Sequence, residues 1–431
     1  MAVRRIGWPA AVIAAAVLLA GCSGSVRSMA SLTGAAGPLP TAASTTRSAP
    51  VTVPALPAPV GAPWPGTAAA TPTVAGPVVV TADPVFGTGG LPPTAPVTIT
   101  VAHGRITALQ VTSPQGAALT GAMSPDGTSW TLAEPLGYGT IYTVSGTATG
   151  ADGEPVPITG TYTTVTPAGE VTTGISPAPG STVGVAAPVI VTLDHAPADR
   201  ALIERHVHIT TTPQVQGGWA WVQHDGQDHP SLDWRPKDYW PTGTRVHVES
   251  DLYGLDLGGG LFRGDNATSD FTIGHNQVVL ADASSHLFVV QRGGRTVATY
   301  PASFGSGDLI GDPSRVTRSG IHVVMDKQET TLMSIPADGY VPEKWAVRIS
   351  DNGEFIHQNQ DTVAAQGTTN VSHGCINLSA DNARAYYDSA IYGDPVQVTG
   401  TSVALSAADG DIYDWAIPWQ QWQTLPGAAA Q

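Results

Sequence analysis

The sequence predicts a mainly β protein that contains several domains. Its 431 residues and 44.2 kDa exceed the size of one ordinary domain. Only 12% of the residues are charged, while 49 are Gly and 36 are Pro, a composition typical of turn-rich β-structure rather than helical bundles. Short runs with alternating apolar residues, such as Val97 to Val101, recur between Gly, Pro and Asp residues. These observations favour β-domains joined by short turns.

The charge balance argues against a nucleic-acid partner. The formal net charge is −15 and the isoelectric point is about 5.0. No basic stripe is present that could neutralise phosphates.

The N-terminus reads as an export signal that ends at a lipidation site. Arg4 and Arg5 precede an apolar run from residue 10 to 20, which is too short for a comfortable membrane span. The sequence Leu19-Ala20-Gly21-Cys22 resembles a bacterial lipobox, which predicts cleavage of residues 1–21 and lipidation of Cys22. Acyl chains on Cys22 would hold the protein on the outer face of the cytoplasmic membrane. An uncleaved anchor or an ordinary secretory signal is the alternative.

Residues 22–70 are expected to form a tether. They are mostly Ala, Pro, Ser, Thr and Gly, and they carry almost no apolar periodicity. Such a segment cannot bury a core, so we expect it to be disordered or polyproline-like and to extend toward the cell wall.

An internal repeat predicts two related β-sandwich domains, at residues 71–168 and 169–275. Trp130 precedes the Gly-Thr pair at residue 139 by the same offset that separates Trp234 from the Gly-Thr pair at residue 243. A spacing repeated after about a hundred residues is typical of two domains of immunoglobulin-like size.

Neither sandwich is expected to carry chemistry. The histidines show no metal-ligand spacing, so no metal site is predicted among His206, His208, His224, His229 and His247. Trp219 and Trp221 share one strand face, where packing is favoured over sugar stacking.

The stretch whose residue types indicate a catalytic site is Ser372-His373-Gly374-Cys375-Ile376-Asn377. Cys375 is one of two cysteines, and a lone thiol in an exported protein is either buried and inert or kept free for chemistry. Gly374 allows a substrate carbonyl to approach the backbone, whose N–H groups could stabilise an oxyanion. His357 or His373 could take the thiol proton and leave a nucleophilic thiolate. No cofactor is expected for such chemistry.

This array resembles the signature of the L,D-transpeptidases (the YkuD domain), which remodel peptidoglycan. Fourteen residues separate His357 from Ser372. The resemblance covers residues 276–400 and includes further segments: residues 365–367, Asn370, residues 379–387 and residues 393–396. With the lipobox and the upstream repeat, it implies the lipid-anchored form with two Ig-like domains, a β-rich catalytic domain with a short helix, and a C-terminal extension at residues 401–431.

The resemblance also implies roles for single residues. Cys375 would be the nucleophile and His357 the proton acceptor and donor, with the backbone carbonyl of Gln358 as the third group. His373 and Gly374 would orient the loop or serve the oxyanion site. The residues expected to hold the peptide stem are Tyr340, Asn352, Gly353 and Asn377, and those at lid positions are Ser303 to Gly305, Met333 and Tyr340.

Local patterns position these residues. Gly293-Gly294 predicts a hairpin of residues 286–300, and Asn352-Gly353 predicts a turn that pairs residues 345–350 with 354–357. A helix capped by Ser379 is expected to run to about Ile391, placing Cys375 just before a helix start. Four aromatic residues beyond Thr401 must find a surface on which to bury: Tyr413, Trp415, Trp419 and Trp422.

By this resemblance, the expected partners are peptidoglycan stem peptides, the membrane through Cys22, and β-lactams of the carbapenem type. The expected reaction is formation of a 3→3 cross-link from a tetrapeptide stem with release of D-alanine. An L,D-carboxypeptidase, with water as the acceptor, is one alternative. A catalytically idle wall-binding lipoprotein is another. Sortase-like chemistry is disfavoured because no Arg shortly follows a Thr-Leu-x-Thr-Cys strand.

Overall fold

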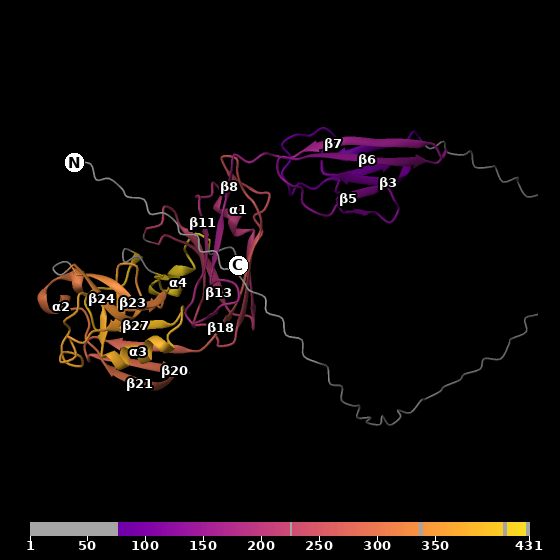
Figure 1. Cartoon of the computed structure of the whole chain (residues 1–431). Coiled ribbons are helices and arrows are strands. Elements are labelled where there is room, and N and C mark those ends of the chain that lie inside the picture. The colour runs from indigo at the N-terminus through magenta and orange to yellow at the C-terminus, as the bar shows by residue number, and fades with distance from the viewer. Residues whose placement is uncertain (1–75, 225, 336–338, 408–411, 428–431) are drawn as a thin grey trace, which may run out of the picture. The chain divides into compact units, whose positions relative to one another are not determined.

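The computed structural model describes residues 76–224, 226–335, 339–407 and 412–427 (Figure 1). The predicted signal peptide, the predicted lipidation site Cys22 and the predicted tether lie outside these residues. Within the described ranges, none of the helices combines the length and the apolar character that a membrane crossing requires. Strands dominate and helices are short, so the mainly β fold class is confirmed.

The first sandwich is formed by two antiparallel sheets. Its strands are β1 (Val79–Asp83), β2 (Thr98–Ala102), β3 (Gly104–Thr112), β4 (Gly121–Met123), β5 (Ser129–Leu132), β6 (Ile141–Gly150) and β7 (Pro155–Thr163). The sheet orders are β1-β2-β5-β4 and β3-β6-β7. Alternation buries Ile99 of β2 and Tyr142 of β6 while their neighbours face solvent, and both belong to one core with Trp130.

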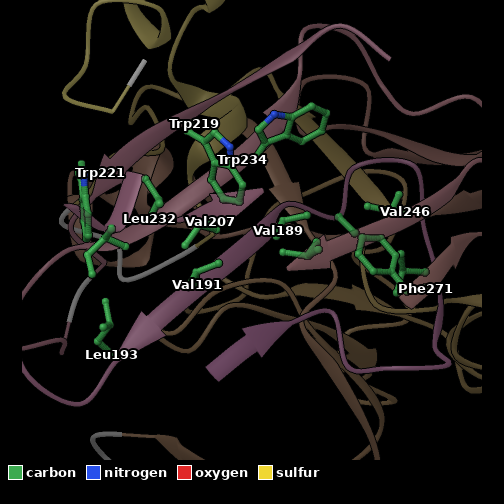
Figure 2. Packing of buried hydrophobic residues seen from close by; sticks show 14 of the residues in the cluster. Val189, Val191, Leu193, Val207, Trp219, Trp221, Leu232, Trp234, Val246 and Phe271 are labelled. Atoms are coloured by element: carbon green, nitrogen blue, oxygen red, sulfur yellow. The ribbon is translucent and has the colours of Figure 1, made fainter. Parts of the chain in front are cut away.

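The second sandwich is larger and has a core rich in tryptophan. Its elements are β8 (Gly169–Val171), β9 (Thr173–Ser176), β10 (Thr182–Val183), β11 (Val189–Leu193), α1 (Arg200–Glu204), β12 (Val207–Thr212), β13 (Gly217–Val222), β14 (Ser231–Pro236), β15 (Arg245–Ser250), β16 (Asp256–Gly258), β17 (Leu261–Arg263) and β18 (Ala267–Ile273). The two main sheets have the orders β13-β14-β11-β9 and β10-β18-β15-β12. Figure 2 shows Trp219, Trp221 and Trp234 among the packed aliphatic side chains. Both Trp219 and Trp221 are buried, which supports packing over sugar stacking.

The repeated Trp-to-Gly spacing corresponds to a repeated structure. Trp130 and Trp234 are both buried in a strand of one sheet. Gly139 and Gly243 have φ values of 57° and 81°, and each turns the chain into a strand of the other sheet. The two sandwiches therefore share this arrangement of a buried Trp in one sheet and a Gly turn into the other. The exact domain boundaries at residues 168 and 275 stay predictions.

The C-terminal β region contains two sheets around one core. Its elements are β19 (Gln277–Asp282), β20 (Leu287–Arg292), β21 (Arg295–Pro301), α2 (Gly307–Ile310), η1 (Pro313–Arg315), β22 (Gly320–Val323), β23 (Asp326–Ile335), β24 (Gly339–Arg348), β25 (Phe355–Gln358), β26 (Ile376–Leu378), α3 (Ala380–Ser389) and β27 (Pro395–Thr399). The sheet orders are β21-β20-β19-β27-β22 and β23-β24-β25-β26. Phe288 of β20 and Tyr386 of α3 meet at 4.9 Å between ring centroids, so α3 closes this core (Figure 1).

The predicted hairpins of this region are confirmed, and the predicted helix ends early. β20 pairs with β21, and β24 pairs with β25 across the turn at Asn352-Gly353. Ser379 caps α3 by accepting a hydrogen bond from Asn382 N at 3.4 Å. The helix ends at Ser389 rather than near Ile391. The Nζ of Lys327 donates to the carbonyls of Tyr387 and Ala390 at 2.7 and 2.8 Å, which satisfies helix-terminal acceptors without a glycine cap.

The aromatic tail, residues 412–427, buries against two parts of the chain. It contains η3 (Asp414–Ala416) and α4 (Trp419–Trp422). Ile412 and Trp415 pack in a cluster with Ala186 of the second sandwich and Val323 of β22. Trp422 packs on Ala220 and Val222 of β13.

Arg235 is the centre of the tail contact. Its guanidinium lies over the rings of Trp415, Trp419 and Trp422 at 4.7, 5.3 and 4.9 Å. It also donates to the carbonyl of Ile417 at 2.7 Å. A buried cation thus holds the tail to the second sandwich.

We predict that Trp422→Ala destabilises the protein by about 3–5 kcal/mol, the usual effect of emptying a buried aromatic site. Trp422 is 0% exposed and its Nε1 donates to the Gly218 carbonyl at 2.9 Å. Thermal unfolding checks this, with Gln420→Ala on an exposed position of the same helix as the control. Equal unfolding midpoints for the two variants would contradict the tail's structural role.

Candidate active site

Strand pairing brings Cys375 close to His357. The strands β25 and β26 run parallel, with Ile356 opposite Ile376 and His357 opposite Asn377. Cys375 directly precedes β26, so it lies beside β25 although eighteen positions separate it from His357 in the sequence. The interaction between the imidazole and the thiol is strong enough to raise the pKa of His357. The structure therefore brings together the two residues that the sequence placed in catalysis.

The imidazole of His357 is buried and oriented from its other side. Its Nδ1 donates to the Gln358 carbonyl at 2.7 Å, which leaves Nε2 for the thiol. The Glu343 carboxylate of β24 lies 3.4 Å from the same Nδ1. Burial lowers the pKa of His357, but hydrogen bonds and charge interactions with Cys375 and Glu343 outweigh it and raise the pKa to about 10. A raised pKa favours the imidazolium through neutral pH, and an imidazolium stabilises a neighbouring thiolate.

The loop before Cys375 is held by hydrogen bonds from both sides. Ser372 Oγ donates to the Cys375 carbonyl at 2.5 Å and accepts from Gly374 N at 3.1 Å. Thr317 Oγ1 donates to the Gly374 carbonyl at 2.7 Å. Gly374 has a φ of 131°, a conformation that side chains rarely adopt. This geometry fixes the position of the thiol, which is partly exposed.

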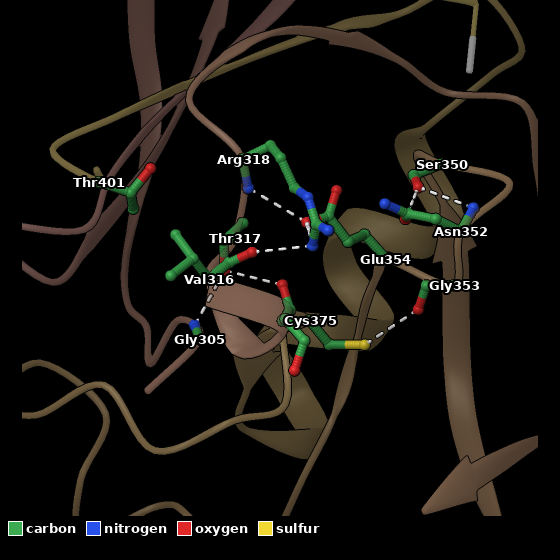
Figure 3. Close-up of polar contacts among 12 residues, drawn as sticks. Gly305, Val316, Thr317, Arg318, Ser350, Asn352, Gly353, Glu354, Cys375 and Thr401 are labelled. Atoms are coloured by element: carbon green, nitrogen blue, oxygen red, sulfur yellow. Dashed lines mark hydrogen bonds and ion pairs between the residues drawn. The ribbon is translucent and has the colours of Figure 1, made fainter. Parts of the chain in front are cut away.

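The turn after β24 forms the other wall of the thiol site. Cys375 Sγ donates to the Gly353 carbonyl at 3.5 Å (Figure 3). The next residue, Glu354, is 3% exposed and accepts from Arg318 N at 3.1 Å and Arg318 Nη1 at 3.3 Å. Figure 3 shows this pair beside Cys375 and the Asn352 turn. A buried ion pair thus anchors the turn that carries Gly353.

The structure separates the roles expected of His373 and Gly374. The side chain of His373 is exposed. The Gly374 N–H is occupied by Ser372, which favours an orienting role. Within the described ranges, Cys375 N has no hydrogen-bond partner and remains free to donate to an oxyanion.

The expected stem-binding residues fall into two groups. Asn352 and Gly353 lie beside the thiol, and Asn352 N donates to Ser350 Oγ at 3.1 Å. Tyr340, at the start of β24, is 73% exposed and can contact a ligand directly. Asn377 is only 1% exposed, and its Nδ2 donates to Thr362 Oγ1 at 3.3 Å. Its contacts are those of a residue that supports the loop after β25.

Two expectations about the surroundings of Cys375 are wrong. Ser303 to Gly305 form no lid: Ser303 bridges to Asn377 and Gly305 to Ser372, so this segment is the support of the catalytic loop. Cys375 also does not lie at a helix start, because β26 separates it from α3. The dipole of a helix decays within its first turn, so α3 contributes little to the thiolate.

Glu343 is the residue near the catalytic pair that sequence patterns missed. It lies fourteen positions before His357, on a strand that reaches His357 only through the pairing of β24 with β25. Its side chain is 15% exposed, which protects the interaction with Nδ1 from solvent. No spacing rule identifies such an acid. It lies two positions before the strand of residues 345–350 that was predicted to pair with residues 354–357, and the observed strand β24 extends far enough to include it.

We predict that Glu343→Gln moves the alkaline limb of the pH profile to lower pH. Without the carboxylate, the pKa of His357 falls, so the imidazolium is lost at a lower pH. Because the pKa of His357 starts at about 10, losing one charge-assisted hydrogen bond leaves the imidazolium in place at neutral pH, so the alkylation rates of variant and wild type should differ on the alkaline side of the profile and agree near pH 7. Alkylation measured against pH tests this, with Glu329→Gln on the exposed part of β23 as the control. Identical profiles for Glu343→Gln and wild type would remove Glu343 from the site.

Comparisons with known proteins identify the families that this sequence matches. Residues 276–398 match the family described as L,D-transpeptidase catalytic domain, and residues 88–256 match the family described as bacterial Ig domain. L,D-transpeptidase 5 of Mycobacterium tuberculosis is 48% identical over 326 residues, which cover 74% of this chain and 71% of that protein. L,D-transpeptidase 2 of the same species is 36% identical over 75% of this chain and 78% of that protein. A solved L,D-transpeptidase in complex with imipenem is 35% identical, with a TM-score of 0.44 over 53% of this chain and 99% of that one.

Proposed function

The chain belongs to the L,D-transpeptidase family, whose members act on peptidoglycan, and we propose that it forms 3→3 cross-links through an acyl-enzyme on Cys375. The observation that supports this most is the arrangement of Cys375, His357 and the Gln358 carbonyl. The hydrogen bond of Nδ1 to that carbonyl orients the imidazole so that Nε2 is left for the thiol proton, and the pKa of about 10 means that His357, once it has taken this proton, holds it as an imidazolium beside the thiolate.

The first half-reaction forms the acyl-enzyme and releases D-alanine. His357 takes the thiol proton, which ends the hydrogen bond of Cys375 with Gly353, and the thiolate attacks the carbonyl of the L,D amide between stem residues three and four. The negative charge on the carbonyl oxygen is stabilised by the N–H of Cys375. His357 then gives its proton to the leaving nitrogen, the amide bond breaks, and a thioester on Cys375 remains.

The second half-reaction transfers the acyl group to an amine. The side-chain amine of a neighbouring stem attacks the thioester carbonyl, and His357 accepts the proton that this amine loses. The bond to sulfur breaks, and the thiolate–imidazolium pair is restored. Tyr340, Asn352 and Gly353 hold the donor stem, because they are exposed at the hairpin or adjoin the thiol.

The experiment that tests the proposal is mass spectrometry of the products from a disaccharide-tetrapeptide. We expect a cross-linked dimer together with one free D-alanine per link. Tripeptide alone, with no dimer, would identify the L,D-carboxypeptidase and overturn the cross-linking proposal. Unchanged substrate would support the idle wall-binding lipoprotein instead.

A carbapenem is the proposed inhibitor class for this site. The strained lactam carbonyl can accept the Cys375 thiolate, and ring opening then leaves a stable thioester. Intact-mass analysis should show one added inhibitor per chain, located on the peptide that contains Cys375. Labelling that persists in Cys375→Ala would contradict this reaction.

We propose further that the protein is anchored at Cys22 to the outer face of the cytoplasmic membrane, from where it reaches the cell wall. The support is the sequence before Cys22. Cys22→Ser should release or misprocess the protein, because the lipid is attached through a thioether to the Cys22 sulfur, which serine lacks. Cell fractionation with a labelled fatty acid checks this. A variant that stays labelled and membrane-bound would disprove the lipobox interpretation.

A further inference from the structure

Three buried ionisable side chains meet where the aromatic tail contacts the second sandwich. His224 follows β13, Asp233 lies in β14, and Asp414 begins η3 of the tail. They are 7%, 0% and 0% exposed. One nitrogen or oxygen atom of each lies within 4.8 Å of those of the other two. The cluster plays no part in the reaction at Cys375.

Two members of the cluster are already oriented. His224 Nε2 and Asp233 Oδ2 are 2.7 Å apart. Ser231 Oγ donates to the other oxygen of Asp233 at 2.7 Å, which fixes the plane of that carboxylate. An oriented imidazole–carboxylate pair with a supporting hydroxyl is the kind of preorganised donor set that metal sites use.

Asp414 is the member that lacks a partner. Both of its carboxylate oxygens are buried, and neither has a hydrogen bond. An isolated buried carboxylate is costly unless a cation or a proton neutralises it.

Arg235 does not supply the missing cation directly. No ion pair between Arg235 and Asp414 occurs in the described part of the chain. The two Nη atoms of Arg235 donate to the carbonyls of Pro236 and Ile417, and its face lies on three tryptophan rings. Its charge acts on Asp414 only at longer range.

We propose that His224, Asp233 and Asp414 bind a divalent cation of the zinc type. One imidazole nitrogen and two carboxylate oxygens suit zinc, whereas magnesium and calcium prefer oxygen ligands alone. Ligands at about 2.0–2.2 Å from zinc lie roughly 3.3 Å from one another, which small side-chain movements of this cluster achieve. Water completes a four-coordinate site, and the metal neutralises the buried Asp414 carboxylate.

The proposed metal joins the tail to the sandwich. Two ligands come from the sheet that contains β13 and β14, and the third comes from the tail. No metal site was predicted from the sequence, because the histidines alone show no ligand spacing. The two missing ligands are aspartates on separate elements.

Zinc binding by the full chain tests the proposal, in a Cys375→Ala background so that the catalytic thiol does not bind the metal. After treatment with EDTA, dialysis against Zn²⁺ and metal analysis should give one additional zinc per chain, and the unfolding midpoint should rise with zinc. Asp414→Asn and His224→Gln should each lose at least tenfold in affinity. The matched control is His247→Gln, which removes an exposed imidazole that is 2.8 Å from Asp270 and belongs to no metal-ligand cluster in the described part of the chain.

Three outcomes would overturn the metal site. Wild-type chain that binds no more zinc than Asp414→Asn excludes it. Zinc that remains bound in both Asp414→Asn and His224→Gln lies elsewhere. If the midpoint of the protein that keeps Asp414 does not respond to zinc, while Asp414→Asn raises the midpoint, a proton and not a metal neutralises Asp414. The wild-type measurement decides the question even if one variant fails to fold.

Discussion

Replacing Cys375 with alanine is expected to reduce cross-linking to background. Among the described residues it is the single free cysteine, so no other thiol there can form the acyl-enzyme. The loop supports this residue in particular, because Ser372 and Thr317 hold the backbone on both sides of it. Product analysis on a disaccharide-tetrapeptide measures the effect.

Cys375→Ser is the matched control for packing at this position. It keeps the size of the side chain but supplies a hydroxyl, which His357 ionises far less readily than a thiol. Both variants should unfold at the wild-type temperature, because Cys375 is partly exposed. Turnover near wild type in a folded Cys375→Ala protein would refute the assignment of the nucleophile.

Replacing His357 with glutamine is expected to lower activity by about 10²–10⁴, the usual effect of losing a general acid–base. The amide fills most of the space of the imidazole but neither accepts the thiol proton nor returns one to the leaving amine. Alkylation of Cys375 at neutral pH should slow as well, because the thiolate loses its imidazolium partner.

His208→Gln provides the control for this variant, since His208 lies on an exposed position of β12 and has no contact with the catalytic loop. If alkylation and turnover of His357→Gln match those of wild type, another base must serve Cys375. His373 would then be the next candidate, despite the exposed position of its side chain.

Much of the site could be predicted from the sequence because its key residues lie in short local patterns. The Asn352-Gly353 turn predicted the pairing of β24 with β25, and that pairing positions His357. The motif around Cys375 identified the loop. The parallel pairing of β25 with β26, which brings the thiol to the imidazole, was not expressed in any local pattern.

The residues that sequence analysis missed act across the fold. Glu343 reaches His357 from a neighbouring strand, and Asp414 reaches Asp233 from the far end of the chain. Arg235 reads as an ordinary strand residue, yet it is the cation on which three tail tryptophans pack. Such contacts depend on tertiary structure, so spacing along the chain does not reveal them.

Local signals also erred where a tertiary contact replaced them. Gly393 was expected to end the helix that follows Cys375. Instead, the Nζ of Lys327 in β23 donates hydrogen bonds to carbonyls at the end of that helix. The helix therefore ends at Ser389. The segment at Ser303 to Gly305 resembled a lid, whereas its backbone pairs with the catalytic loop.

Rapid quenching of the enzyme with a disaccharide-tetrapeptide, followed by peptide mass mapping, tests the central claim most directly. We expect a tripeptide acyl group on the peptide that contains Cys375, and this adduct should decay as the cross-linked dimer forms. A dimer that forms without any adduct on Cys375, or an adduct on a different residue, would contradict it.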